Sequence, residues 1–271
     1  MFIEVLKAVI FGIIQGITEW LPISSTGHLL LINEFLNLDL GEDFLNMFKV
    51  VIQFGSILAV IVLYFSKLNP FSPSKNAAEK KSTLVLWFKI IVAVIPAAVV
   101  GFAFEDVIDS KLSAPIVIAA ALIIYGIAFI IIENQEKKPK INSLDDISYK
   151  QAIMIGIFQT LALIPGTSRS GSTILGAVLI GASRTVASEF SFFLAIPVMF
   201  GASALKMLGF GLGLSSVQWA VLITGTLVSF VVSLAAIKFL MNYIRKHDFK
   251  AFGYYRIILG LLVIAYFAFF R

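Results

Sequence analysis

Apolar residues run through this chain in long, nearly unbroken stretches and not in the alternating pattern of a half-buried strand. Six stretches are about 20 residues long, the length at which an α-helix crosses the hydrocarbon core of a bilayer. The pattern therefore predicts an all-α polytopic membrane protein with six transmembrane helices. We expect these helices at residues 47–66, 84–104, 114–133, 187–208, 217–240 and 253–270.

Two further apolar stretches, residues 5–34 and 150–181, are interrupted near their middle by proline, glycine and a run of hydroxyl residues. Each half is too short to cross a bilayer alone. Irregular polar backbone is tolerated at membrane depth only where it is buried in protein or lines a water-filled cavity. We therefore expect two re-entrant helical hairpins, each of which returns to the side of the membrane that it entered.

The composition excludes an ordinary soluble domain. Hydrophobic residues make up 59% of the 271 positions and charged residues 14%, whereas soluble domains hold roughly a quarter charged residues. The chain has no cysteine, which excludes disulfides and thiolate chemistry. Glu4 and Lys7 interrupt the first apolar stretch, so we expect no cleavable signal peptide.

The net charge of +5 lies mostly in short connections, where it reports orientation and not nucleic-acid binding. Basic and non-basic connections alternate along the six helices, which places the basic ones in the cytoplasm and both termini outside. The basic connections are residues 67–83, 134–150 and 241–252; residues 37–46 and 209–216 carry no lysine or arginine, and 105–113 carries only Lys111.

The two interrupted stretches resemble each other. Residues 7–15 (KAVIFGIIQ) match 151–159 (QAIMIGIFQ), and after a one-residue slip 21–28 (LPISSTGH) match 164–171 (IPGTSRSG). Because the hairpins enter from opposite sides, this is an inverted-topology repeat, in which paired broken helices form a polar site near the midplane. The single membrane domain, 1–271, then consists of repeat one, about 1–133, and repeat two, about 150–271.

The first hairpin carries ionisable residues that are costly at membrane depth and usually functional. Gln15 and Glu19 are spaced i, i+4 and share one helix face. Ser25 and His28 are spaced i, i+3, which is close enough for a hydroxyl–imidazole pair. The structural alternative is that Ser24 caps a helix and His28 satisfies a buried carbonyl.

The second hairpin contains a run of small and hydroxyl residues, 165–173, with Arg169 inside it. Free N–H groups at a helix N-terminus favour anions, and a forked guanidinium suits phosphate oxygens. The structural alternative is a capped turn in which Arg169 pairs with an acidic neighbour. The sequence has no HExxH motif, no EF-hand loop and no GxxxxGK[ST] phosphate loop, which argues against a dedicated metal cage and against nucleotide hydrolysis.

At these positions the sequence resembles the bacterial undecaprenyl-diphosphate phosphatase family, also called the bacitracin-resistance proteins. Position 15 carries the amide variant of the family's first motif, so Glu19 is the only carboxylate of that motif. The resemblance extends along essentially the whole chain. The matching residues are Gln15, Glu19, the LPxSSTGH run from Leu21 to His28, and Pro165, Gly166, Ser168, Arg169, Ser170 and Thr173 of PGxSRSxxT.

The resemblance implies hydrolysis of undecaprenyl diphosphate to undecaprenyl phosphate and inorganic phosphate, which recycles the lipid carrier of cell-wall synthesis and confers bacitracin resistance. It implies a multi-pass protein of the bacterial inner membrane whose active site faces the extracytoplasmic side. It also implies a loosely bound divalent cation, Mg²⁺ or Ca²⁺, beside Glu19 and no organic cofactor. The expected partners are a polyprenyl diphosphate lipid and the bilayer, without nucleic acid; whether the chain forms a homodimer stays open.

The catalytic residues that we expect are Glu19, Ser25, His28 and Arg169. Arg169 stabilises the developing charge, and His28 acts as general base or acid. Ser25 or a water molecule attacks phosphorus, and Glu19 orients His28 or helps to bind the cation. The alternative function is a transporter or flippase of a polyprenyl phosphate, because inverted repeats with broken helices are typical of transporters. The expected substrate-binding residues are Gln15, Ser24, Thr26, Gly166, Ser168, Ser170 and Thr173.

Overall fold

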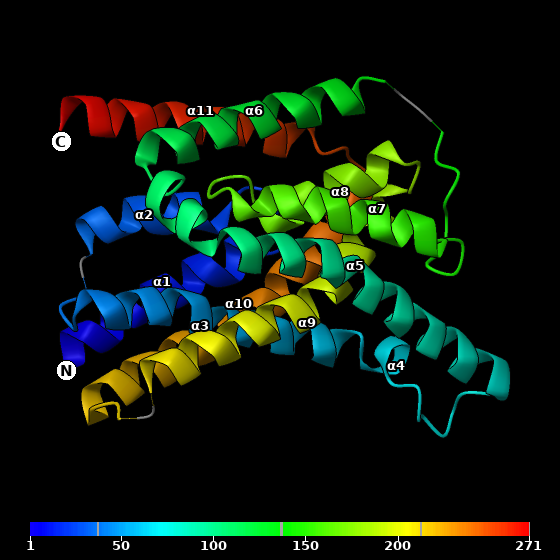
Figure 1. Cartoon of the computed structure of the whole chain (residues 1–271), viewed down its shortest axis with the longest axis horizontal. Coiled ribbons are helices and arrows are strands. Elements are labelled where there is room, and N and C mark those ends of the chain that lie inside the picture. Colours follow the sequence, from blue (N-terminus) through cyan, green and yellow to red (C-terminus); the bar gives the residue numbers. More distant parts are fainter. Residues whose placement is uncertain (37, 136–137, 212, 271) are drawn as a thin grey trace.

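The chain folds into helices joined by short connections (Figure 1). The computed structural model describes residues 1–36, 38–135, 138–211 and 213–270, and at 105–107, 109 and 110 it describes the backbone alone. The β-type pairing within these ranges is a single bridge between Ile141 and Ala182. The elements are α1 (Phe2–Thr18), α2 (Ser25–Phe35), α3 (Glu42–Leu63), α4 (Phe65–Leu68), α5 (Ala77–Lys111), α6 (Pro115–Glu133), α7 (Tyr149–Thr160), the 3₁₀ turn η1 (Leu161–Leu163), α8 (Arg169–Leu179), α9 (Arg184–Phe210), α10 (Ser216–Ile244) and α11 (Lys250–Phe269).

Six of the described helices are long and apolar enough to cross a membrane, which confirms the expected number: α3, α5, α6, α9, α10 and α11. Helix α5 is longer than the expected span 84–104 at both ends. It begins at a capping box in which the Asn76 side chain accepts from the Glu79 N–H and the Glu79 side chain accepts from the Asn76 N–H. It bends at Phe104, whose φ and ψ are not helical, and continues to Lys111.

Four of the shorter helices form two pairs, α1 with α2 and α7 with α8. Figure 1 shows both chain termini and the end of α2 at one end of the molecule, with the start of α7 toward the other end. At that second end the Lys140 and Ile141 N–H groups donate to the Gly181 carbonyl, which follows α8. Each pair thus starts and finishes at one end of the molecule, α1–α2 at the end with the chain termini and α7–α8 at the opposite end.

Glycines let the first helix of each pair approach a long helix closely. A Cβ atom at Gly12 of α1 would lie 2.7 Å from the Gly225 carbonyl oxygen of α10. One at Gly156 of α7 would lie 2.2 Å from the Ala93 carbonyl oxygen of α5. Both distances are shorter than carbon and oxygen tolerate, so these helices pack backbone to backbone, as small residues allow between membrane helices.

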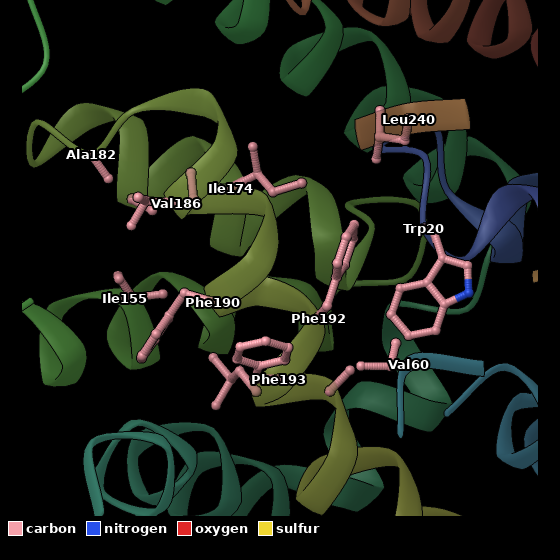
Figure 2. Close-up of a cluster of buried hydrophobic side chains, with 14 of the residues drawn as sticks. Trp20, Val60, Ile155, Ile174, Ala182, Val186, Phe190, Phe192, Phe193 and Leu240 are labelled. Carbon is pink, nitrogen blue, oxygen red and sulfur yellow. The ribbon is translucent and has the colours of Figure 1, made fainter. Parts of the chain in front are cut away.

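The largest apolar cluster lies against the turn that follows α1. Trp20 in that turn is fully buried, and its ring meets Phe192 of α9 edge-on with centroids 5.2 Å apart. Figure 2 shows Val60 beside Trp20, and Phe190 and Phe193 on the same helix as Phe192. This packing fixes the turn between α1 and α2 against α9, and Glu19 lies immediately before Trp20 in the same turn.

Candidate active site

The two turns that join the short helices meet each other, residues 19–24 from the first pair and 161–168 from the second. Ser170 Oγ donates to the Glu19 carbonyl oxygen at 2.9 Å. Arg169 Nη2 lies 3.1 Å from Glu19 Oε1. Residues 150 positions apart are thereby joined by an ion pair and a hydrogen bond.

Helices α2 and α8 begin at this junction with the same capping geometry. Ser24 and Ser168 are the described non-glycine residues with positive φ, at 72° and 73°. Each hydroxyl accepts from the N–H three residues later, Gly27 N at 3.3 Å and Gly171 N at 3.1 Å. The cap at Ser24, which was the structural alternative for this residue, is therefore present, and both helices point their N-terminal N–H groups toward the junction.

The matched caps also correct the sequence alignment of the two hairpins. Ser24 corresponds to Ser168, and the separation of these two serines along the chain equals that of Gln15 and Gln159. The one-residue slip, which pairs Ser24 with Thr167, is wrong. The slip was introduced to align the prolines of 21–28 and 164–171. The capping serines show instead that the two helix pairs keep one constant register.

Glu19 lies at the centre of the junction and is 6% exposed. Its Oε1 accepts from Arg169, and its Oε2 accepts from Gln15 Nε2 at 3.0 Å and from Ser25 Oγ at 3.2 Å. Buried carboxylates need such partners, because an uncompensated charge in a low-dielectric interior is costly. The predicted residues Gln15, Glu19, Ser25 and Arg169 therefore come together as one cluster.

Arg169 is held on both sides of its guanidinium. Nη1 donates to the Ser191 carbonyl at 2.8 Å and to the Ser191 hydroxyl at 3.3 Å, and the group lies 5.7 Å from the Trp20 ring centroid. Thr173 Oγ1 contacts Ser191 Oγ at 2.7 Å and donates to the Arg169 carbonyl at 2.9 Å. In this arrangement Thr173 is fully buried and supports the arginine.

His28 does not form the expected pair with Ser25. Its Nδ1 lies 2.7 Å from the Ser24 carbonyl oxygen, and its Nε2 lies 2.7 Å from the hydroxyl of Tyr255 on α11. The Ser25 hydroxyl instead donates to Glu19. The i, i+3 spacing places Ser25 and His28 close together on one helix, but the Ser24 carbonyl and the Tyr255 hydroxyl occupy the two imidazole nitrogens instead. Glu19, for its part, bonds to Gln15, Ser25 and Arg169 and does not orient His28.

The remaining predicted residues line the two turns. Thr26 is exposed in the first turn of α2. Gly166 has φ 93°, and a Cβ there would lie 2.5 Å from the Ile118 carbonyl oxygen, so only glycine fits. Ser168 Oγ contacts Ser170 Oγ at 3.2 Å. These residues shape the junction mostly through backbone geometry.

Arg256 of α11 is a further residue of the junction that the motifs did not reveal. It is fully buried, and Nη1 donates to the Pro22 carbonyl at 3.1 Å. Nη2 donates to the Gly166 carbonyl at 3.0 Å and the Thr167 carbonyl at 2.8 Å. One guanidinium thus ties both turns together. Its hydrogen-bond partners among the described residues are all backbone carbonyls, so no carboxylate hydrogen-bonds to its charge.

The junction has more positive than negative charge, since Arg169 and Arg256 outweigh Glu19. Within the described residues, Arg169 Nε and Gln15 Oε1 are buried without a hydrogen-bond partner. The described part of the chain contains no group of three or more His, Asp or Glu side chains suited to a metal ion. Glu19 therefore fits a divalent cation only where other oxygens, such as those of a phosphate, complete its coordination.

Comparisons with known proteins match this chain over nearly its full length. The family described as bacitracin resistance protein BacA matches residues 8–262. A protein of Clostridioides difficile (strain 630) named undecaprenyl-diphosphatase 1 is 59% identical over 98% of this chain and 97% of its own length. Undecaprenyl-diphosphatases of Enterococcus faecalis (strain ATCC 700802 / V583) and Acetivibrio thermocellus are 59% and 56% identical, over 99% and 98% of both chains.

Proposed function

This chain belongs to the bacitracin resistance protein BacA family, and from that premise we propose that it is an undecaprenyl-diphosphatase. It hydrolyses undecaprenyl diphosphate to undecaprenyl phosphate and inorganic phosphate, and so recycles the lipid carrier of cell-wall synthesis. The observation that carries the proposal is the convergence of Arg169 and Ser25 on the Glu19 carboxylate at 3.1 and 3.2 Å. A cation, a nucleophilic hydroxyl and a base in one buried cluster suit phosphoryl transfer better than passive transport.

Substrate recognition rests on the positive charge of the junction. Two helix N-termini, at α2 and α8, and the guanidinium of Arg169 face the position of the terminal phosphoryl group. Arg169 then stabilises the charge that develops on the phosphoryl oxygens, and Arg256 adds its field from behind the turns. The prenyl tail lies along the lipid-facing surface, where the spanning helices expose apolar side chains.

The nucleophile in this proposal is Ser25, with Glu19 as its base. Glu19 Oε2 accepts the Ser25 proton, Ser25 Oγ bonds to the terminal phosphorus, and the bond from phosphorus to the bridging oxygen breaks to release undecaprenyl phosphate. A water molecule, which gives a proton to His28, then attacks phosphorus, and the bond from phosphorus to Ser25 Oγ breaks. Glu19 returns its proton to Ser25 Oγ, and phosphate leaves. In the competing route water attacks directly and Ser25 only donates a hydrogen bond.

A divalent cation, Mg²⁺ or Ca²⁺, belongs to the proposal as a partner of the substrate. Glu19 is the residue that would hold it, together with diphosphate oxygens, and the ion would neutralise charge on the leaving group. Gln15 supports Glu19 through its 3.0 Å hydrogen bond and cannot itself act as acid or base.

The proposed membrane arrangement has two re-entrant hairpins, α1–α2 and α7–α8, in an inverted repeat, with the site open to the extracytoplasmic side of the inner membrane. Three observations support it. Each pair starts and finishes at one end of the molecule, and the lysine-rich connections gather at the end where α7 begins (Figure 1). The caps at Ser24 and Ser168 and the close contacts at Gly12 and Gly156 recur in one register.

The test is phosphate release by the purified protein in detergent, with undecaprenyl diphosphate and Mg²⁺ or Ca²⁺. Hydrolysis needs no second compartment, whereas transport does. Arg169→Ala should lower phosphate release about 100-fold to 1000-fold, and Arg245→Ala, which replaces an exposed arginine outside the junction, is the matched control. A native protein that moves a polyprenyl phosphate across vesicles but releases no phosphate in detergent contradicts the proposal and favours the transporter alternative.

A further inference from the structure

We propose that Tyr255 is a positioning residue for His28, which fixes the orientation of the imidazole and leaves Nε2 as the nitrogen that exchanges protons. This inference deepens the proposed function and rests on it, since the proton that His28 moves belongs to the hydrolysis of the phosphate ester. Tyr255 lies on α11, 227 positions from His28, outside both hairpins.

The partners of His28 determine its tautomer. A backbone carbonyl oxygen only accepts hydrogen bonds, so Nδ1, at 2.7 Å from the Ser24 carbonyl, carries the hydrogen. In the neutral ring Nε2 then holds a lone pair, and the Tyr255 hydroxyl at 2.7 Å donates to it. The two rings are nearly parallel, with an interplanar angle of 6° and centroids 5.6 Å apart. Two hydrogen bonds and a stacked ring therefore leave the imidazole little rotational freedom.

Tyr255 suits both charge states of His28. When the ring takes a proton from water, the Tyr255 hydroxyl gives its own proton to Nε2 and takes the proton of the water in its place, because a phenolic oxygen both donates and accepts. The hydroxyl then accepts the new Nε2–H. When the ring releases the proton, the hydroxyl takes it back and passes its other proton to a phosphate oxygen, and the resting arrangement returns.

The adjacent residue on α11 strengthens the argument. Arg256 holds carbonyls of both turns, including Pro22, two residues before the Ser24 cap. Consecutive side chains of one helix thus fix the turn backbone and the imidazole together. A shift of α11 would move both at once, so the histidine keeps its place relative to the two turns.

The kinetic experiment compares Tyr255→Phe with Tyr254→Phe in the full-length protein. Tyr254 is the neighbouring tyrosine, 55% exposed, and its hydroxyl has no hydrogen-bond partner among the described residues. Tyr255→Phe keeps the stacked ring and loses only the hydroxyl. We expect its kcat to fall about 10-fold to 100-fold with KM changed less than about 3-fold, because the loss affects proton transfer and not binding. Tyr254→Phe should keep native kcat and KM.

A spectroscopic experiment reads the pair without catalysis. The chain has two histidines, so His247→Gln leaves His28 as the only source of ¹⁵N signals after ¹⁵N-histidine labelling. We expect the neutral ring to carry its hydrogen on Nδ1. Tyr255→Phe should shift the Nε2 resonance and leave Nδ1 protonated, whereas Tyr254→Phe should shift neither.

A hydrogen on Nε2 in the neutral native ring, or a Tyr255→Phe protein with the kcat and the spectrum of Tyr254→Phe, overturns the inference. Native protein that releases no phosphate from undecaprenyl diphosphate refutes the proposed function instead. In that outcome the spectra still decide whether Tyr255 holds His28.

Discussion

Arg256→Met is the substitution that most directly tests how the two turns are held together. Methionine fills much of the same volume but donates no hydrogen bond. The change leaves the carbonyls of Pro22, Gly166 and Thr167, now bonded at 3.1, 3.0 and 2.8 Å, without their donor. It also removes a buried positive charge from behind the junction.

The magnitude follows from two opposing effects. Each buried carbonyl left without a donor costs about 1–3 kcal/mol, so three of them set an upper bound of about 9 kcal/mol. Removing a guanidinium that no carboxylate hydrogen-bonds to relieves a desolvation penalty of several kcal/mol. We therefore expect the free energy of unfolding to fall by about 3–5 kcal/mol, which is the cost of the carbonyls less the desolvation penalty that is relieved. Turnover should fall at least about 100-fold, because displacing catalytic groups by about 1 Å has that effect.

The assay combines thermal unfolding in detergent with phosphate release. Arg256→Lys is the second variant, since an ammonium keeps the charge but reaches fewer of the carbonyls, and it should unfold between native and Arg256→Met. If Arg256→Met fails to fold, the lysine variant still has to show reduced turnover. Native unfolding temperature and turnover in Arg256→Met would refute the reasoning, because the turns would then hold together without this guanidinium.

Three other predictions concern the junction and its orientation. Arg169→Ala should lower turnover about 100-fold to 1000-fold, the effect of removing one preorganised donor, and Arg169→Lys should also be poor because it loses the forked contact; near-native turnover of the lysine variant would contradict a catalytic role. Glu19→Gln and Ser25→Ala should each be severe, and their combination should cost little beyond either one, since members of one catalytic unit are strongly non-additive; additive losses in the double variant would separate Ser25 from Glu19. A cysteine at Gly213 should react with a membrane-impermeant thiol reagent in intact cells and one at Ser74 only after lysis, because the proposed arrangement places the connections that carry them on opposite sides of the membrane; the reverse labelling pattern would invert the proposed topology.

The spans and the two turns were predictable because local rules determine them. A stretch such as Pro115–Glu133 is apolar over its whole length, and its length alone predicts a crossing. Hydroxyl residues before a helix predict caps, which Ser24 and Ser168 confirm. The predicted pairing of Ser25 with His28 was wrong because spacing along one helix says nothing of partners on another, and α11 supplies Tyr255 to the same imidazole.

Arg256 was missed for a different reason. A span is recognised by its hydropathy averaged over about 20 residues, and one arginine among the apolar residues of 253–270 barely changes that average. The signal was nonetheless present, since an arginine at membrane depth is costly and calls for a buried partner. The sequence could not have named that partner, because its acceptors are backbone carbonyls, which every residue carries.

The two helix pairs, α1–α2 and α7–α8, share the geometry of their caps and yet form an asymmetric site. Ser25 and Arg169 occupy the same position in their repeats, the first residue of the helix after the capping serine. Equal local geometry therefore aims both side chains at the junction, where Ser25 donates to one oxygen of the Glu19 carboxylate and Arg169 to the other. The position that matches Glu19 in the second hairpin is Leu163, so the repeat supplies one acid and not two. Two carboxylates at the junction would repel each other and the phosphate substrate, whereas in the proposed mechanism the serine is the nucleophile, the arginine binds the anion and the single glutamate is the base. The proposed chemistry thus depends on the residues at which the two helix pairs differ, and the caps that both pairs share hold those residues in place.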